Sequence, residues 1–364
     1  MIKIFFKTTA DFNNTGEVLI YKSLLEFLRN YGEIIVNDDN TIDKTFLSRI
    51  CVQKEERLSS LTNSNFLPYM LRLCLSKNKV ALVTGVGDHK ISNIKDSIKN
   101  ILSFNFLLLL RLFGLKIIRI GASMSFNGRI ALLSEKLVSI PINHYYVRDS
   151  ISYSNCLKAG VKKCKIAPDL SWGYSIKYNK EKKERECVYM TFRPYCDDIK
   201  NNIDYKEHLT NVIIYVINAL TQQNYKIVLC YQCLKDYEYM QYIYKNVANN
   251  DNVQLLNEMI TLDNADKYYC NAKFILSNRL HCLLLGYKFD APTICLTDVD
   301  KHKKIVGIFN DNNISDAIID IKQPMDKIVS KINSTNLLDI EARYRSAEQE
   351  NKTTLQGILK DIFY

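Results

Sequence analysis

The chain of 364 residues is longer than one hydrophobic core usually supports, so we expect two domains. Its hydrophobic fraction of 47% is ordinary for a globular protein and excludes a chain that stays disordered. The formal net charge of +10 favours phosphorylated small molecules, an anionic membrane face or nucleic acid as partners, and the first of these is preferred because acidic residues interrupt the basic ones.

The first half of the chain alternates short apolar runs with amphipathic segments, which is typical of βαβ units in a parallel sheet. A polar turn follows the first apolar run, and apolar residues at helical spacing over 18–28 predict the first helix. Gly160 stands where a C-cap is expected after a helix over 150–159. The predicted strands cover residues 2–8, 80–84, 115–121 and 145–150.

A charged run over residues 177–185 separates two apolar segments and predicts an interdomain linker. The alternation then restarts, with strands predicted over 187–192, 226–230, 274–276 and 293–296 and a helix over 208–221. The second half is therefore α/β as well.

These boundaries predict an N-terminal, acceptor-side domain over residues 1–178 and a C-terminal, donor-side domain over 186–335. A helical segment over 336–364 is expected to pack back on the N-terminal domain. Two Rossmann-like α/β domains facing a cleft make a glycosyltransferase-B-like architecture, which holds ligands at the carboxyl ends of both sheets.

The longest apolar run, residues 104–115, is interrupted by Asn105 and Arg111 and is shorter than the roughly 20 residues that cross a bilayer. We expect a buried amphipathic helix there. The N-terminus lacks the apolar core and small-residue cleavage site of a signal peptide, which favours the cytoplasm, including the inner face of the plasma membrane.

The eleven cysteines are scattered through predicted strands and helices, and only Cys230 and Cys233 have CxxC spacing. A zinc site usually needs a second ligand pair, which the sequence lacks. Reduced, buried thiols are therefore the favoured interpretation, and no metal site is expected.

Asn14-Thr15-Gly16-Glu17 lies between the first predicted strand and the first helix. Its amides and short polar side chains suit a substrate, and Glu17 suits an acid, a base or a hydroxyl ligand. A plain helix entry with Asn14 or Thr15 as N-cap explains the pattern equally well. The turn 85–88 fits a phosphate cradle less well, because it lacks the third glycine of the dinucleotide-binding fingerprint, and a simple turn is favoured.

Two further charged residues follow predicted strands of the first domain. Arg148 either points into the cleft or forms a structural pair with an aspartate, and Asp149 or Ser150 after it would cap the next helix. Asp169 either binds a sugar hydroxyl or braces the edge of the domain, and bracing is slightly favoured.

The most informative segment is Ser277-Asn278-Arg279-Leu280-His281, where an apolar strand ends and an apolar helix begins. Helix N-termini and strand ends of open α/β sheets bind anions. Arg193 closes the first strand of the same domain, and guanidinium groups match carboxylate and phosphate oxygens in bidentate fashion. Lys304 opens a later helix, where it either reaches the anion or lies in a solvated loop. His281 alone would more often be a core histidine, but beside Arg279 it favours an anion site.

Other classes of protein lose support from what the sequence lacks. It contains no Ser-His-Asp order, HExxH helix, P-loop or carboxylate-rich metal site, which disfavours hydrolases and ATPases. It contains no recognition helix or RNP motif, so nucleic-acid binding rests on charge alone and is not expected.

The chain resembles the polysaccharide pyruvyl transferase family over about residues 1–320. The segments that carry the resemblance, in family order, are residues 14–17, 147–152 with 160–161, 168–170, 277–281, 291–292 and 304–307. Two positions depart from the family: Glu17 stands where an aspartate is usual, and Gly121-Ala122-Ser123 is a short version of a glycine-rich stretch. Both concern the acceptor half of the expected cleft.

The resemblance implies transfer of a carboxyvinyl group from phosphoenolpyruvate to a sugar diol, giving a pyruvate ketal and phosphate in bacterial capsule or exopolysaccharide biosynthesis, with no cofactor. It implies that the donor is bound by Arg193, Ser277, Asn278, Arg279, His281 and Lys304. It implies that the acceptor, a nucleotide- or lipid-linked sugar, is bound by Asn14, Gly16, Glu17, Arg148 and Asp169. The implied catalytic residues are His281, Arg279 and Glu17.

A glycosyltransferase that uses a nucleotide sugar or another phosphorylated donor is the main alternative, because arginines would equally hold a diphosphate and the fold does not decide between reactions. A non-catalytic binder of sugar phosphates is less favoured. The basic residues leave peripheral membrane contact open, and the sequence leaves the oligomeric state open.

Overall fold

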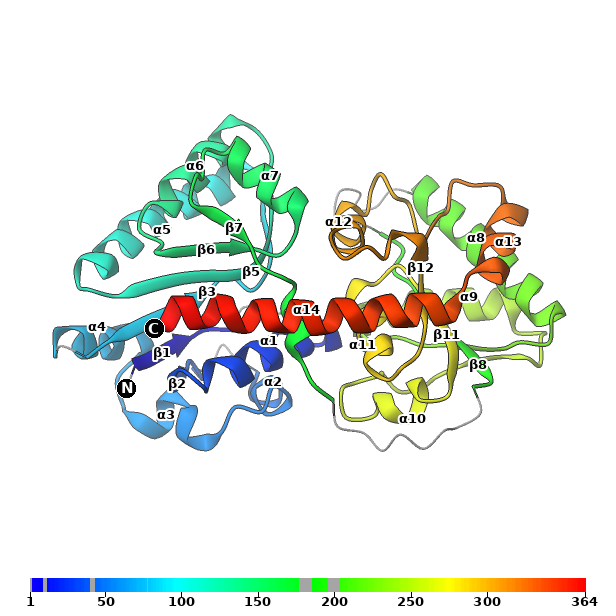
Figure 1. Ribbon diagram of the computed structural model, residues 1–364, viewed down its shortest axis with the longest axis horizontal. Helices are drawn as coiled ribbons and strands as arrows, with labels where there is room; N and C mark the ends of the chain where they lie inside the picture. Colours follow the sequence, from blue (N-terminus) through cyan, green and yellow to red (C-terminus); the bar gives the residue numbers. More distant parts are fainter. Residues whose placement is uncertain (1, 9–11, 40–42, 77, 177–184, 196–202) are drawn as a thin grey trace. The chain divides into compact units, whose positions relative to one another are not determined.

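The computed structural model of the protein describes residues 2–8, 12–39, 43–76, 78–176, 185–195 and 203–364. These residues form two compact units, each built on a parallel sheet flanked by helices (Figure 1). The first unit comprises Met1–Phe12, Glu17–Tyr174 and Glu350–Tyr364, and the second comprises Asn13–Gly16 and Ser175–Gln349. The predicted linker, residues 177–185, lies outside the described residues apart from its last residue.

The sheet of the first unit has the strand order β2-β1-β3-β5-β6-β7, and β4 pairs with the end of β5. Its strands are β1 (Ile2–Phe6), β2 (Gly32–Val36), β3 (Val80–Thr84), β4 (Gly87–Ile91), β5 (Lys116–Phe126), β6 (His144–Val147) and β7 (Cys164–Ile166). Its helices are α1 (Thr15–Leu28), α2 (Lys44–Arg49), α3 (Leu58–Leu61), α4 (Phe66–Leu75), α5 (Ile94–Leu112), α6 (Arg129–Ser139) and α7 (Ser150–Lys158), with short 3₁₀ turns η1 (Lys54–Glu56) and η2 (Leu170–Gly173).

The central strands of this sheet are almost continuously apolar because helices cover both of their faces. Phe5, Leu82 and Ile117 come from three neighbouring strands and are buried in one core cluster. The predicted strands at 2–8, 80–84 and 115–121 are confirmed within a few residues, whereas β4 was not expected.

The sheet of the second unit has the order β10-β9-β8-β11-β12-β13. Its strands are β8 (Cys187–Thr191), β9 (Lys226–Leu229), β10 (Val253–Leu255), β11 (Ala272–Ser277), β12 (Thr293–Thr297) and β13 (Ile318–Asp320). Its helices are α8 (Ile203–Gln222), α9 (Leu234–Val247), α10 (Ala265–Tyr269), α11 (Leu280–Lys288), α12 (Lys303–Asp311) and α13 (Met325–Ser334), with a 3₁₀ turn η3 (Ser315–Ala317).

This second strand order is that of a Rossmann fold, in which the chain first runs outward from the central strand and then crosses to its other side. The crossing places β8 and β11 side by side, with Val188–Thr191 in register with Phe274–Ser277. Ligands of such sheets bind outside the carboxyl ends of the two strands at this switch point. The residues that follow β8 and β11 are therefore the first place to look for a site.

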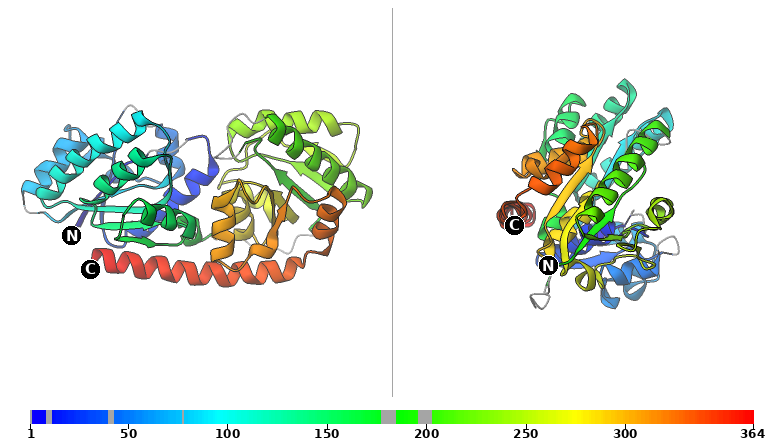
Figure 2. Two further views of the ribbon diagram at one scale, coloured as in Figure 1. Left: turned by 90° about the horizontal axis from the view of Figure 1, so that it is seen from above. Right: turned by 90° about the vertical axis from the view of Figure 1, so that its right-hand side faces the viewer.

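The last helix, α14 (Leu337–Phe363), is the long red helix in Figures 1 and 2. Its first part belongs to the second unit, where Tyr344 stacks on Tyr287 and accepts a hydrogen bond from Thr293. Residues from Glu350 onward belong to the first unit, where Phe363 stacks on Tyr31. This division differs from the predicted one, in which all of 336–364 packs on the N-terminal domain.

The segment 13–16 also differs from the predicted boundaries, because it packs with the second unit. Thr15 donates its amide hydrogen to the carbonyl oxygen of Gln232 at 2.8 Å, and Asn14 forms a β-bridge with Cys233. These backbone bonds join residues more than two hundred positions apart, so no local sequence pattern could reveal them.

The prediction that residues 104–115 lie in a buried helix is wrong. They form the end of α5 and the turn after it, and Phe106, Leu109 and Leu112 are exposed. Only part of the helix, including Leu110, is buried against the core.

Every cysteine that the structure describes carries a free thiol. Within the described ranges, no three histidine, cysteine or acidic side chains gather closely enough to hold a metal ion. None of the described helices combines the length and the apolar character needed to cross a membrane.

Candidate functional site

Two sets of charged residues lie at the carboxyl ends of the two sheets, one in each unit. In the second unit, Arg193 follows β8 and Arg279 follows β11, so the two arginines stand at the switch point of this sheet. Both side chains are half-buried. The backbone of Arg279 forms the N-cap of α11, where unpaired amide groups favour negative charge.

Ser277 and Asn278 fix the backbone around these arginines. Asn278 is fully buried; its side-chain oxygen accepts from the Arg193 amide at 2.9 Å and its amide donates to the Arg193 carbonyl at 3.0 Å. Ser277 donates to the carbonyl of Thr191 at 2.7 Å and accepts from the amide of Arg279 at 2.9 Å. Their side chains therefore position Arg193 and Arg279, which is a different task from the predicted contact with a donor.

The guanidinium of Arg279 forms an ion pair with Asp236, a fully buried residue in the first turn of α9. Burial alone would lower the pKa of Arg279, but the carboxylate of Asp236 outweighs it and raises that pKa above its ordinary value. Within the described residues, Nε of Arg279 is buried and has no hydrogen-bond partner. A buried donor on a permanent cation is a site that an anionic oxygen can satisfy.

Tyr195 lies beside both arginines. The guanidinium carbon of Arg193 is 5.7 Å from the centre of its ring, and the same tyrosine affects the pKa of Arg279. An aromatic face within this distance holds a guanidinium in place without neutralising its charge. The ring of Tyr195 therefore helps to fix the Arg193 guanidinium at this end of the sheet.

His281 lies in the first turn of α11 and is half-buried. Gly16 approaches it so closely that a Cβ on Gly16 would lie 2.7 Å from the His281 Nδ1 and 2.8 Å from its Cβ. The side-chain oxygen of Asn14 accepts from the Gly16 amide at 3.0 Å, and Thr15 donates to the carbonyl of Ile260 at 2.8 Å. The structure thus brings Asn14 and Gly16 together with His281 inside the second unit.

Lys304 lies in the first turn of α12, the helix that follows β12. The prediction that residues 304–307 begin a helix is confirmed, and β12 is the direct neighbour of β11. Contact of Lys304 with a donor remains a prediction.

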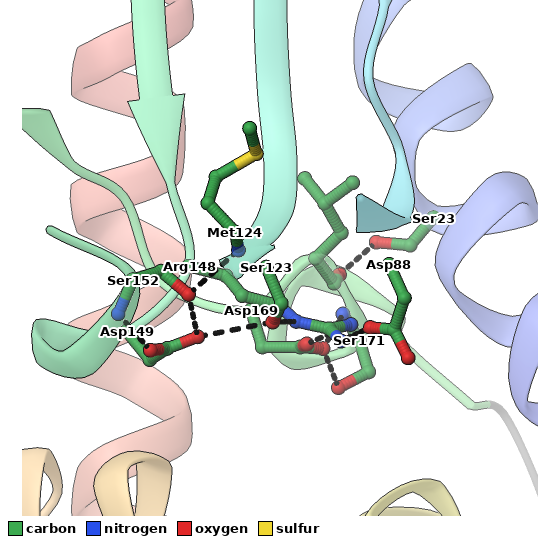
Figure 3. A network of polar contacts seen from close by, with 10 residues as sticks. Ser23, Asp88, Ser123, Met124, Arg148, Asp149, Ser152, Asp169 and Ser171 are labelled. Atoms are coloured by element: carbon green, nitrogen blue, oxygen red, sulfur yellow. Dashed lines mark hydrogen bonds and ion pairs between the residues drawn. The ribbon is translucent and has the colours of Figure 1, made fainter. Parts of the chain in front are cut away.

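In the first unit, Arg148 follows β6 and is the centre of a polar network (Figure 3). Its guanidinium donates to the hydroxyl oxygen of Ser123 at 2.6 Å and pairs with Asp88 at 2.6 Å and Asp169 at 3.2 Å. Burial alone would lower the pKa of Arg148, but these aspartates raise it above its ordinary value. The structural pair with an aspartate, one of the two predicted alternatives, is therefore the geometry that the structure has.

Two buried aspartates connect this network to the backbone. Asp149 caps α7 by accepting from the Ser152 amide at 2.6 Å, as the sequence predicted. Asp169 accepts from the amide and the hydroxyl of Ser171 at 2.9 and 2.6 Å, which caps η2. Asp169 therefore braces two chain segments, the favoured of its two predicted roles.

Glu17 lies in the first turn of α1 and belongs to the first unit. Its carboxylate faces the loop after β3, where a Cβ on Gly87 would lie 3.6 Å from Oε2, and it contributes to the raised pKa of Arg148. Gly87 has φ +94°, a conformation that L-residues with a side chain rarely adopt. The turn over 85–88 thus relies on glycine at position 87, and its aspartate, Asp88, pairs with Arg148.

Sequence reasoning missed Asp236 and Tyr195, and it named Ser123 only as part of a short glycine-rich stretch. Tyr195 was detectable, since it comes two residues after Arg193 at a strand end. Asp236 was not, because it lies on a helix and only the fold brings it to Arg279.

A comparison with known protein families matches most of the chain. The family model described as polysaccharide pyruvyl transferase matches residues 14–298, which include Asn14 at its start and the segment 277–281 near its end. The chain belongs to the polysaccharide pyruvyl transferase family. No curated protein sequence matches the chain.

Solved structures show the same fold at low sequence identity. A putative UDP-N-acetylglucosamine 2-epimerase from Listeria monocytogenes has a TM-score of 0.62 and 9% identity, covering 98% of this chain and 94% of its own. The UDP-GlcNAc 2-epimerase from Neisseria meningitidis, solved bound to UDP-GlcNAc, has a TM-score of 0.57 and 11% identity, with coverages of 99% and 98%. MurG from Acinetobacter baumannii has a TM-score of 0.52 and 10% identity, with coverages of 100% and 98%. The predicted glycosyltransferase-B-like fold of two Rossmann-like units is therefore confirmed.

Proposed function

We propose that this member of the family transfers a carboxyvinyl group from phosphoenolpyruvate to two hydroxyls of a sugar, forming a pyruvate ketal during the biosynthesis of a bacterial surface polysaccharide. The observation that carries the proposal is the buried, unsatisfied Nε of Arg279 at the switch point, beside Arg193 and His281 in the second unit. Phosphoenolpyruvate carries a carboxylate and a phosphate, and two guanidinium groups suit two anions.

The proposed reaction balances without a metal or an organic cofactor. The oxygens of the two sugar hydroxyls both bond to the carbon that carried the phosphate, and the C–O bond to phosphate breaks. Of the two protons that the hydroxyls release, one balances the proton taken up by the methylene carbon and the other leaves with phosphate. We assign Arg193 and Arg279 to the donor's anionic groups and His281 to phosphate binding or protonation. Fixed cations are effective here because negative charge grows on the departing phosphate.

Fewer residues are assigned to the sugar acceptor than the sequence predicted. Arg148 and Asp169 are buried in internal ion pairs, so we assign them to bracing rather than to contact with the sugar. Glu17 remains the proposed base for a sugar hydroxyl. Asn14 and Gly16 support His281, as their packing inside the second unit indicates.

Arg279→Lys tests the proposal directly. The lysine keeps a positive charge for Asp236 but removes the Nε–H donor and the planar fork. We expect both readouts to fall by about a hundredfold or more. The first is phosphoenolpyruvate binding, measured by calorimetry. The second is ketal formation with a panel of nucleotide- and lipid-linked sugars, measured by mass spectrometry. Arg343→Lys is the matched control, because Arg343 is a partly exposed arginine of α14 that pairs with Asp316 and Asp339 at the surface, and it should change neither readout.

A glycosyltransferase is the second candidate, supported by the Neisseria protein of the same fold that was solved with UDP-GlcNAc. The same experiment separates the two. If the wild-type protein does not bind phosphoenolpyruvate but transfers a sugar from a nucleotide donor, ketal formation is refuted and the glycosyltransferase alternative is favoured.

A further inference from the structure

Helix α5 carries an apolar stripe that the structure leaves exposed. Its side chains recur every three or four residues and therefore line one face of the helix. They are between 39% and 77% exposed, although residues of this type are usually buried. The stripe consists of Ile94, Ile98, Leu102, Phe106, Leu109 and Leu112.

The neighbouring helix α6 extends this apolar surface. Ile130 and Leu133 of α6 and Ile140, the C-cap residue that follows it, are 51–57% exposed. The two helices pack closely against each other, and α5 is the cyan helix at the outer side of the first unit in Figures 1 and 2. We call the exposed side chains of these two helices the α5–α6 face. Large apolar side chains that gather on the exposed sides of two adjacent helices mark a docking site more often than a free surface.

The charged residues around this face are nearly all basic. Lys95, Lys99 and Arg111 of α5 are exposed, as are Arg129 and Lys136 of α6. Residues 94–166 contain three acidic side chains, and those of two, Glu135 and Asp149, are buried. The third, Asp96, is half-buried and accepts hydrogen bonds from Ser92 at the start of α5.

We propose that the α5–α6 face docks the protein on an anionic lipid surface. An amphipathic helix lies in such a surface with its apolar side among the acyl chains and its lysines and arginines at the headgroups. Each of these basic residues near an anionic leaflet strengthens binding. The inference stands independently of the proposed reaction, because it uses no residue of the candidate functional site.

A second copy of this chain is a weaker explanation of the same face. A twofold interface brings identical patches together, so the basic rims of the two copies would face each other without acidic partners. An anionic bilayer satisfies both features at once, since it offers an apolar layer and negative charge.

The test is sedimentation of the full chain with vesicles of phosphatidylcholine alone or mixed with phosphatidylglycerol. We expect binding to the anionic vesicles, at least about tenfold weaker binding to the neutral ones, and loss of binding in high salt. The double variant Leu102→Glu with Leu112→Glu should weaken binding to anionic vesicles by about tenfold or more. Leu338→Glu is the matched control, because Leu338 is equally exposed but lies on α14, and it should bind like the wild type.

Circular dichroism melting of each variant shows whether it folds, and the substituted positions are exposed enough to tolerate glutamate. A second pair changes charge alone: Lys95→Gln with Lys99→Gln should weaken binding to anionic vesicles, whereas Lys245→Gln on α9 should not. The proposal is overturned if the wild-type protein does not bind anionic vesicles. It is also overturned if the leucine variant binds them unchanged, or if that variant only converts a dimer into a monomer in sedimentation velocity. Arg279→Lys should bind anionic vesicles like the wild type. The vesicle experiment can therefore be interpreted even if the proposed reaction is wrong.

Discussion

Arg148 and Arg279 follow parallel strands in similar positions, but their surroundings give them different tasks. Arg148 has a side chain that is 3% exposed, and it donates to Ser123 and pairs with Asp88 and Asp169. Arg279 is 16% exposed and pairs with Asp236, while its buried Nε has no hydrogen-bond partner among the described residues. The number of acceptors that the fold brings to each guanidinium decides whether it braces the protein or can bind a ligand.

The same contrast extends to the loops around the two arginines. In the first unit, Asp88 of β4 and Asp169, the N-cap residue of η2, both pair with Arg148, so the positive charge of its guanidinium is compensated within the protein. In the second unit, Asn278 and Ser277 accept hydrogen bonds from the backbone amides of Arg193 and Arg279. These bonds position the two arginines at the carboxyl end of the sheet without neutralising their side chains. A strand-end arginine therefore indicates an anion site when the fold leaves one of its donors without an acceptor, as it does at the Nε of Arg279 among the described residues.

The largest effect that tests this comparison is expected from Arg148→Met. Removing the guanidinium leaves the buried carboxylate of Asp169 without its cation, which typically costs about 3–5 kcal/mol of unfolding free energy. Urea unfolding at neutral pH measures this loss. The double variant Arg148→Met with Asp169→Asn should recover part of it, because the uncompensated charge is gone.

Phosphoenolpyruvate binding by Arg148→Met tests whether Arg148 braces the protein rather than binding the donor. At temperatures where Arg148→Met stays folded, phosphoenolpyruvate should bind about as it does to the wild type. Unchanged unfolding together with lost donor binding would show instead that Arg148 is a ligand residue.

A second effect comes from His89 of β4, the residue that follows Asp88 in the first unit. Burial, followed by the positive charge of Arg119 and Arg148, lowers the pKa of His89 to about 4, against the opposing influence of Glu135 and Asp88. The unfolded chain binds this proton near the ordinary pKa of about 6.5, before the folded protein does. Stability should therefore fall as the pH falls from about 6.5 to 4, by up to about 3 kcal/mol from this group.

The variant His89→Gln isolates that contribution. Its unfolding free energy should match the wild type at pH 7.5 and decline less steeply at lower pH, as measured by urea unfolding across this range. Equal slopes for the two proteins would mean that His89 takes up its proton without cost.

Local sequence patterns predicted much of the fold and part of the site. Alternating apolar runs located most of the strands, and Asp149 and Gly160 marked the two ends of α7 as expected. The association of Arg193 with Arg279 was predictable as well, since both follow apolar strands and parallel strands end at one edge.

What the sequence could not supply was the identity of distant partners. Nothing near Asn14 indicates that it pairs with Cys233, and nothing near Arg279 indicates Asp236 on α9. The apolar stripe of α5 failed as a predictor of burial for a similar reason. Periodicity shows that a helix has an apolar face, but not whether this chain or another surface covers it.

The smallest expected effect concerns the second unit and uses Gly16→Ala. The added methyl group would lie within 3 Å of the His281 imidazole and of its Cβ, so either His281 or the segment 13–16 must move. If His281 acts on the donor, a shift of this size should lower turnover by about tenfold to a hundredfold. Gly357→Ala is the control, because the described residues outside its own helix leave the added methyl on α14 in open space. It should keep turnover while stabilising the helix by about 0.5–1 kcal/mol. Turnover that survives Gly16→Ala unchanged would separate His281 from the chemistry and leave the arginines alone as the candidate donor site.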